Sequence, residues 1–254
     1  MARRPNQDIE QMNSRNFNNP LYARSSDDIL TGNPRTDLAI RSSLSGMDIV
    51  IDQTWDGSPI IDHEPITLHM EWLFERQNGR PHKRAIKCYM RAPLFDDPDP
   101  PETPSGICPE LWNYEVFELF LANNRNQYVE VEVGPHGHWL VLLLDGVRKP
   151  FNNGEELELS VQNSFIGNIW QCTFEIPLAY LPGNVCKMNA YHIHGPKDNR
   201  IYKAYSPVTD GTFTEPDFHR LEFFKRFNLH DVIPNTYGNM PFIDYKYDNF
   251  WEGR

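Results

Sequence analysis

The sequence has no apolar run of membrane-spanning length, no paired-cysteine motif and no excess of basic residues. Its longest apolar run, residues 139–144, has the length of a strand, whereas a spanning helix needs roughly 18 apolar residues or more. No apolar segment follows Arg3 and Arg4, so we expect no secretory signal. These absences predict a soluble, cytoplasmic protein with no membrane partner.

The cysteines and the net charge argue against a disulfide-linked protein and against a nucleic-acid-binding protein. Cys88, Cys108, Cys172 and Cys186 show no C-x-x-C spacing, and we expect reduced thiols in an intracellular protein. The formal net charge is −11. This charge disfavours nucleic acid as a partner, because contacts to phosphates need a basic surface.

Sequence motifs of common enzymes are also missing. There is no Gly-rich phosphate loop, nucleophile elbow, HExxH or dinucleotide fingerprint. Ser160 and Ser206 have no neighbours that would activate a hydroxyl group. We therefore predict no catalytic residue, and the absences favour a binding protein over an enzyme.

The most informative stretch that is present covers residues 112–145. Three apolar-rich runs in it are separated by short turns rich in Asn and Gly, a pattern typical of an antiparallel meander. The middle run alternates valines with Tyr128, Glu130 and Glu132, so the valines share one face of the strand and the acidic residues the other. Acidic groups on a largely apolar sheet can hold a polar ligand.

About ten strand-sized runs, of which the last covers residues 219–224, are spaced along the chain without a long helix. This pattern predicts an all-β fold, an antiparallel β-sandwich, with an up-and-down barrel as the alternative architecture. We expect residues 46–254 to form one domain, with the aromatic C-terminal tail packed on it. Residues 1–45 are polar and lack periodicity, so we expect a disordered arm that could carry a site for a protein partner.

Carboxylates and one tryptophan suggest a ligand site near the meander. Four glutamates, Glu115, Glu118, Glu130 and Glu132, could supply the acid–base pair of a glycoside hydrolase or accept hydrogen bonds from sugar hydroxyls, although a solvated strand face is the usual explanation for them. Trp112 follows a long proline-rich insert and could stack on a sugar ring, although core packing is its more common role.

Histidines and basic residues give two further candidates. His192 and His194 lie two positions apart in a strand-like run, so both could reach one metal ion or ligand, and a metal-dependent enzyme on a β-sandwich is an alternative function. Chance is the stronger explanation, because His-x-His pairs are common in sequences. Lys197 and Arg200, in the polar loop that follows, could hold an anionic group or a sugar hydroxyl, or belong to a plain hairpin turn.

Several segments together resemble family-nine carbohydrate-binding modules and their DOMON-like relatives. The matching segments, in the family's order, are E-L-F-L at 118–121, Y-V-E-V-E-V-G-P-H-G at 128–137, W-Q-C-T-F-E-I-P-L-A-Y-L at 170–181, N-A-Y-H-I-H at 189–194, Y-S-P-V at 205–208 and D-F-H-R-L-E-F-F at 217–224. The whole chain also resembles an uncharacterised open-reading-frame family, a likeness that supplies no function.

The resemblance implies a β-sandwich that binds sugars, with structural calcium in some members and haem in some DOMON relatives. By position, Trp112 would be a stacking platform, Glu118 would accept sugar hydroxyls and Asn189 would lie in a strand lining the pocket. Two departures weaken the sugar assignment, because His192 stands where the pattern tends to have arginine and His219 replaces a glycine.

The sequence therefore predicts a protein that binds a saccharide or another small polar ligand, without a cofactor unless calcium is structural. An interaction scaffold that uses residues 1–45 is the third hypothesis. The predicted ligand-binding residues are Trp112, Glu115, Glu118, Glu130, Asn189, His192, His194, Lys197 and Arg200, and His192 and His194 are also the candidate metal ligands.

Overall fold

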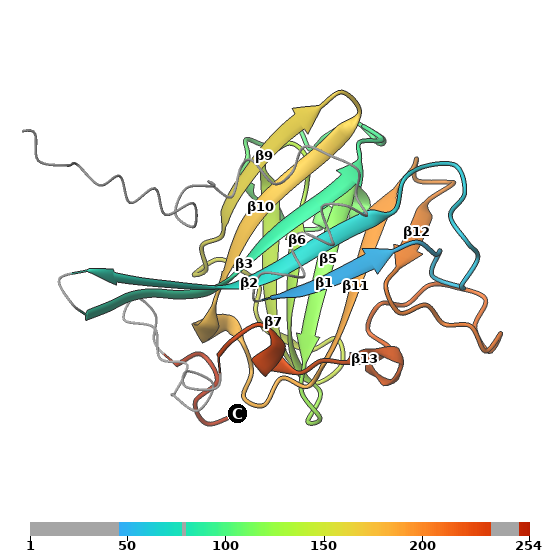
Figure 1. Cartoon of the computed structure of the whole chain (residues 1–254). Coiled ribbons are helices and arrows are strands. Elements are labelled where there is room, and N and C mark those ends of the chain that lie inside the picture. Colours follow the sequence, from blue (N-terminus) through green and yellow to red (C-terminus); the bar gives the residue numbers. More distant parts are fainter. Residues whose placement is uncertain (1–45, 78–79, 235–248) are drawn as a thin grey trace, which may run out of the picture.

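The computed structural model describes residues 46–77, 80–234 and 249–254 (Figure 1). Two β-sheets face each other in it. The smaller sheet is antiparallel and has the order β1-β2-β3-β10-β9. Its strands are β1 (Met47–Ile51), β2 (Ile66–Gln77), β3 (Arg80–Pro93), β10 (Ile169–Pro177) and β9 (Ser160–Ile166).

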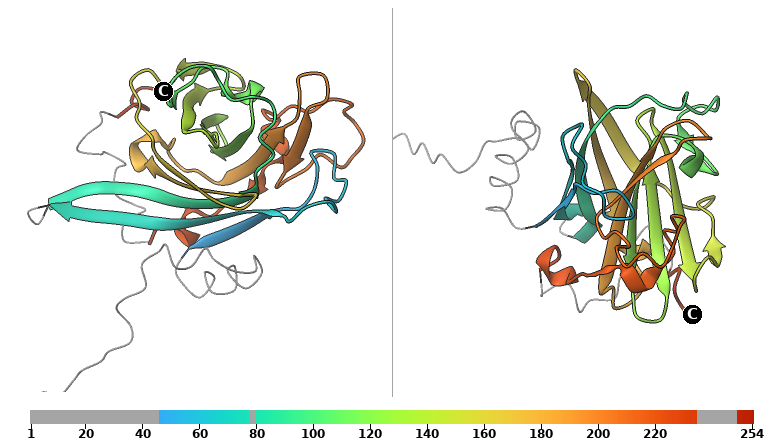
Figure 2. Two further views of the ribbon diagram at one scale, coloured as in Figure 1. Left: turned by 90° about the horizontal axis from the view of Figure 1, so that it is seen from above. Right: turned by 90° about the vertical axis from the view of Figure 1, so that its right-hand side faces the viewer.

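The larger sheet has the order β12-β11-β5-β6-β7-β4, with β13 paired to β11 and β8 paired to β7. It is strongly curved in the view from above (Figure 2). Only the short β4 pairs in parallel among these strands. The strands are β4 (Gly106–Ile107), β5 (Val116–Ala122), β6 (Gln127–Val133), β7 (His138–Asp145), β8 (Pro150–Asn152), β11 (Lys187–His194), β12 (Ile201–Ala204) and β13 (Lys225–Arg226).

Helices in the described residues are single 3-10 turns, η2 (Leu111–Asn113), η3 (Leu178–Tyr180), η4 (Leu221–Phe223) and η5 (Leu229–Asp231). The expected strand at residues 219–224 is therefore wrong, since η4 occupies residues 221–223 within it. None of the helices that the structure describes is long and apolar enough to cross a membrane.

The main core lies between the two sheets. Alternation along β6 directs Val129, Val131 and Val133 into it, and Leu68 and Met70 of β2 approach from the opposite sheet. The predicted meander is confirmed, because β5, β6 and β7 are antiparallel neighbours. The prediction of an all-β sandwich is confirmed with it.

The two ends of the chain are described only in part. Phe250 and Trp251 of the aromatic tail pack against the main core, and the Trp251 indole donates a hydrogen bond to the Tyr180 carbonyl over 3.2 Å. The predicted N-terminal arm, residues 1–45, lies outside the described residues, and so does the tail between residues 235 and 248.

Candidate functional site

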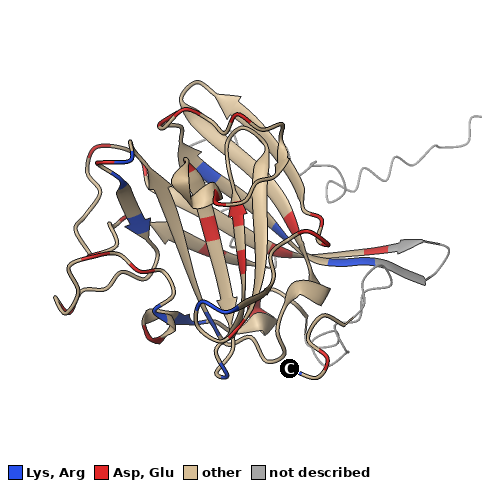
Figure 3. Cartoon of the chain, turned by 180° about the vertical axis from the view of Figure 1, so that it is seen from behind, with Lys and Arg blue, Asp and Glu red and all other residues tan. Residues whose placement is uncertain are grey.

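The face of the larger sheet that points away from the core, here called the outer face, carries three buried glutamates. Glu118 of β5 lies directly opposite Glu132 of β6, and Glu130 lies two residues before Glu132 on the same side. Because neighbouring valines of β6 face the core, these side chains must point outward. We call Glu118, Glu130 and Glu132 the outer carboxyl cluster. Acidic residues lie in the middle of the sheet when it is viewed from behind (Figure 3).

A cavity of about 850 Å³ opens over this face. Strands β5, β6 and β7 of the larger sheet form its base, and loops that are far apart in the sequence form its walls. Trp112 of η2 is 42% exposed and stands at its side. The lining includes Trp112, Tyr114, Glu118, Glu130, Leu142, Arg148, Lys197, Arg200, Tyr202, Asp217, Phe218 and His219. Five predicted site residues thus line one cavity, namely Trp112, Glu118, Glu130, Lys197 and Arg200.

The outer carboxyl cluster is short of hydrogen-bond donors. One oxygen of Glu118, one of Glu130 and both of Glu132 are buried without a hydrogen-bond partner of ordinary geometry in the described protein. Burial raises the pKa of Glu130 to about 8. Burial and the neighbouring carboxylates raise the pKa of Glu118 and of Glu132 well above the usual range. Burial of the three carboxyl groups beside one another therefore favours their protonated forms.

The arginines at the cavity are held by other groups. Arg200 donates hydrogen bonds of 2.7 Å to the carbonyl oxygens of both Trp112 and Tyr114, and one of 2.8 Å to the Gly195 carbonyl. Arg200 therefore fixes the turn that carries Trp112. Arg148 donates to Asp217 over 2.7 Å. Lys197 is exposed at the cavity edge.

The other predicted site residues lie elsewhere. Asn189 is on the outer face, but it is fully buried and its amide donates to the Tyr191 hydroxyl and the Ser206 carbonyl, so it does not reach the cavity. Glu115 accepts hydrogen bonds from the backbone N–H groups of Phe95 and Asp96 over 3.1 and 2.6 Å. Burial raises the pKa of Glu115 to about 6 despite these two donors.

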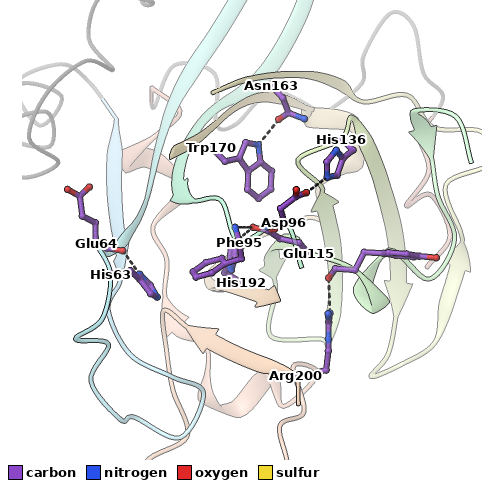
Figure 4. Close-up of polar contacts among 11 residues, drawn as sticks. His63, Glu64, Phe95, Asp96, Glu115, His136, Asn163, Trp170, His192 and Arg200 are labelled. Carbon is purple, nitrogen blue, oxygen red and sulfur yellow. Dashed lines mark hydrogen bonds and ion pairs between the residues drawn. The ribbon is translucent and has the colours of Figure 1, made fainter. Parts of the chain in front are cut away.

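His192 and His194 face the opposite sheet, on the same side of β11 as the core residues Met188 and Ala190. The Phe95 ring stacks on His194 with centroids 3.6 Å apart, and Lys203 Nζ lies 3.9 Å from the centre of the same ring. We call Phe95, His192, His194 and Lys203 the inner cluster. Figure 4 shows Phe95, Glu115 and His192 gathered close together.

Burial and mutual repulsion keep the inner cluster from carrying its full positive charge. Burial, and next the charge of Lys203, lower the pKa of His192 well below its usual value and that of His194 to about 3. Burial lowers the pKa of Lys203 to about 8. Across the residues that the structure describes, no three His, Cys, Asp or Glu side chains are arranged to hold a metal ion.

Several lining residues were not predicted from the sequence. Arg148 and Asp217 form their ion pair between distant loops, and Phe218 stacks on Tyr191 with centroids 3.7 Å apart. His219 Nδ1 and the Tyr128 hydroxyl form a hydrogen bond of 2.7 Å. These contacts depend on loop conformations, which leave no periodic signal in the sequence. The one available signal for His219 was its place in the segment that resembles the binding modules.

Fold and site together define a class, a β-sandwich with an open polar cavity on the curved outer face of its larger sheet. No family model matches the chain. The chain nevertheless belongs to the UPF0462 family: it is 42% identical over 192 residues to the mouse UPF0462 protein C4orf33 homolog, a match that covers 74% of this chain and 94% of the mouse protein.

Other relatives agree with this assignment. The human UPF0462 protein C4orf33 is 40% identical and the zebrafish homolog 37% identical over 192 residues, each covering 74% of this chain and 90% or 91% of the relative. A solved structure, that of a "putative carbohydrate-binding protein" from Bacteroides uniformis, is similar with a TM-score of 0.49 and 13% identity, covering 77% of this chain and 91% of that chain.

Proposed function

We propose that the protein binds a small polyhydroxylated ligand, a saccharide in the first instance, in the cavity on the outer face. One observation carries the proposal. The half-exposed Trp112 indole lines the same cavity as Glu118 and Glu130, and each of these two glutamates has one buried carboxyl oxygen without a hydrogen-bond partner. A sugar needs this combination of a flat apolar surface and polar groups with free hydrogen-bonding capacity.

The size and lining of the cavity support this proposal. Its volume of about 850 Å³ is within the range of about 300–1,000 Å³ that is usual for small-molecule sites. Aromatic rings of Trp112, Tyr114, Tyr202 and Phe218 form part of its lining. Each protonated carboxyl group offers one donor and one acceptor, so the base of the cavity can match hydroxyl groups, which also do both.

We also propose that the domain is a binding module of the family-nine or DOMON-like type. A reducing, cytoplasmic setting is part of the same proposal and agrees with the free state of Cys88, Cys108, Cys172 and Cys186. The resemblance implies structural calcium for some members, and in the described ranges no three His, Cys, Asp or Glu side chains are arranged around one metal position. We therefore propose saccharide binding without a metal ion in the cavity.

Calorimetric titration with a panel of mono- and disaccharides tests the proposal. Trp112→Ala removes the stacking surface and should weaken binding about tenfold, the size of one lost ring contact. Phe165→Ala is the matched control, because Phe165 is an equally exposed aromatic residue on β9 (48%) and does not line the cavity. If the protein bound none of the saccharides with a dissociation constant of about a millimolar or below, the proposal would be contradicted.

The two alternatives from the sequence have their own tests. A metal-dependent enzyme needs a third ligand beside His192 and His194, and the residues described here supply none; stoichiometric zinc or iron in the purified protein, lost in His192→Ala, would favour it. A scaffold function needs residues 1–45, so a pull-down that survives deletion of this segment would count against it.

A further inference from the structure

The outer carboxyl cluster lacks a cation. Glu118 is 2% exposed, Glu130 is 4% exposed and Glu132 is fully buried. Glu118 and Glu130 line the cavity, and each has one oxygen without a hydrogen-bond partner, whereas both oxygens of Glu132 lack one. In the described part of the chain, no lysine or arginine forms an ion pair with any of them. Buried acceptors without partners cost free energy of folding, and a ligand that donates hydrogen bonds to them would explain why they are present.

The nearest cations are not available to fill this role. The guanidinium group of Arg200 donates to the three carbonyl oxygens of Gly195, Trp112 and Tyr114. That of Arg148 is paired with Asp217. The protein thus holds its own basic groups at the edge of the cavity and leaves the carboxyl groups at the base without partners. The missing positive charge is one that a ligand can bring.

A metal ion is a poor candidate for this charge. Calcium or magnesium needs several oxygens converging on one point at about 2.0–2.6 Å, and the described residues contain no group of three side chains with such an arrangement. A primary ammonium group has looser requirements. Its three N–H donors point in different directions and can reach acceptors on neighbouring strands, such as Glu118 on β5 and Glu130 on β6.

We infer that the cavity selects a ligand with a primary ammonium group, and that Glu118 and Glu130 are the groups that bind it. This inference rests on the proposed function, and it narrows the ligand to an amino sugar, which joins an ammonium group to a hydroxylated ring. The hydroxyls and ring face meet Trp112 and the other aromatic side chains of the wall. The ammonium group lies at the base, where it takes the place of a proton that the cluster releases to solvent, and charge-assisted hydrogen bonds satisfy the free oxygens.

Calorimetric titration at pH 7 with four probes tests this inference. D-glucosamine carries the ammonium group, D-glucose carries a hydroxyl in its place, and N-acetyl-D-glucosamine carries a neutral amide. Putrescine has ammonium groups without a ring. We expect D-glucosamine to bind about tenfold to a hundredfold more tightly than either neutral sugar, the usual range for a charge-assisted hydrogen bond.

Two matched variants locate the effect. Glu130→Gln keeps the size and polarity of the side chain and should bring the ratio of the D-glucosamine affinity to the D-glucose affinity close to one, whatever happens to the affinity for D-glucose itself. Glu155→Gln makes the same change at an exposed residue outside the cavity and should alter nothing. Glu118→Gln repeats the test on the neighbouring strand, and thermal melting monitored by circular dichroism shows that each variant is folded.

The outcomes separate this inference from the proposed function. Equal affinity for D-glucosamine and D-glucose would overturn the inference and leave saccharide binding in place. Tight binding of putrescine, lost in Glu130→Gln, without binding of any sugar would support the ammonium site and overturn the saccharide. A preference for D-glucosamine that survives in both Glu130→Gln and Glu118→Gln would overturn the assignment of these residues.

Discussion

The two faces of the larger sheet bury polar groups in different ways. On the outer face, Glu118 and Glu130 lie at the base of an open cavity with oxygens that have no partner. On the inner face, His194 and Lys203 contact the Phe95 ring, which fills the space beside them. Different strands of one sheet thus supply buried ionisable groups to both faces, and the cavity of about 850 Å³ lies on the outer face. Burial and an unusual pKa alone do not identify a binding site.

The two clusters also respond to pH in opposite directions. The outer carboxyl cluster binds protons more strongly in the folded than in the unfolded protein, because the pKa of each glutamate is raised. The inner cluster binds them less strongly, since the pKa values of His192, His194 and Lys203 are lowered. Rising pH therefore works against the outer face, and falling pH works against the inner face.

The largest effect should come from emptying the inner face. Phe95→Ala removes the ring between His194 and Lys203, and we expect the free energy of unfolding in urea to fall by about 3 kcal/mol. Ligand affinity, measured where the variant is folded, should stay within about twofold. Phe165→Ala, on the exposed face of β9, is the control and should cost less than about 0.5 kcal/mol. A large loss of ligand affinity in Phe95→Ala would show that residues of both faces contribute to one binding site.

Filling the outer face with an apolar group should have the opposite effect. Neither carboxyl oxygen of Glu132 has a hydrogen-bond partner of ordinary geometry, so Glu132→Leu should raise the free energy of unfolding by about 2 kcal/mol at pH 8. The measurement is urea unfolding of the variant and of Glu155→Gln, an exposed control. Destabilisation by Glu132→Leu would mean that the glutamate supports the fold.

A somewhat smaller effect concerns the alkaline side of the stability profile. The pKa of Glu130 is raised from 4.5 to about 8, so the stability that its protonated form contributes is complete below pH 4.5 and is lost as pH rises through about 8. Glu130→Gln has no proton to lose. Between pH 5 and pH 8.5 the unfolding free energy of this variant should fall by at least about 1.5 kcal/mol less than that of the wild type. Parallel profiles would show that Glu130 titrates normally.

The smallest effect concerns the acidic side. The pKa of His194 is lowered from 6.5 to about 3, so its contribution is complete above pH 6.5 and is lost as pH falls towards 3. Between pH 7 and pH 5 the unfolding free energy of His194→Gln should fall by at least about 1 kcal/mol less than that of the wild type. Comparing the two pH values within each protein cancels the loss of ring stacking. If the unfolding free energies of the variant and the wild type fell equally between pH 7 and pH 5, the prediction that His194 is buried in its neutral form would be contradicted.

The sequence predicted the outer face better than the inner one, for a physical reason. In β6 valines alternate with polar residues, so the side of the sheet that Glu130 and Glu132 occupy follows from period-two geometry. In β11 seven of the eight residues are buried, on both faces, and no alternation shows which side His192 and His194 occupy. The Lys203–Phe95 contact joins segments more than 100 residues apart, and such pairs follow only from three-dimensional packing.

The most direct test of the central claim, that the outer cavity and not the inner cluster is the ligand site, is an NMR titration of labelled protein with D-glucosamine. We predict that the indole signal of Trp112 and the backbone signals of Glu118, Arg200 and Tyr202 shift with one common affinity, while those of His194 and Lys203 stay in place. Shifts centred on the inner cluster, or none along the cavity at millimolar sugar, would contradict the account.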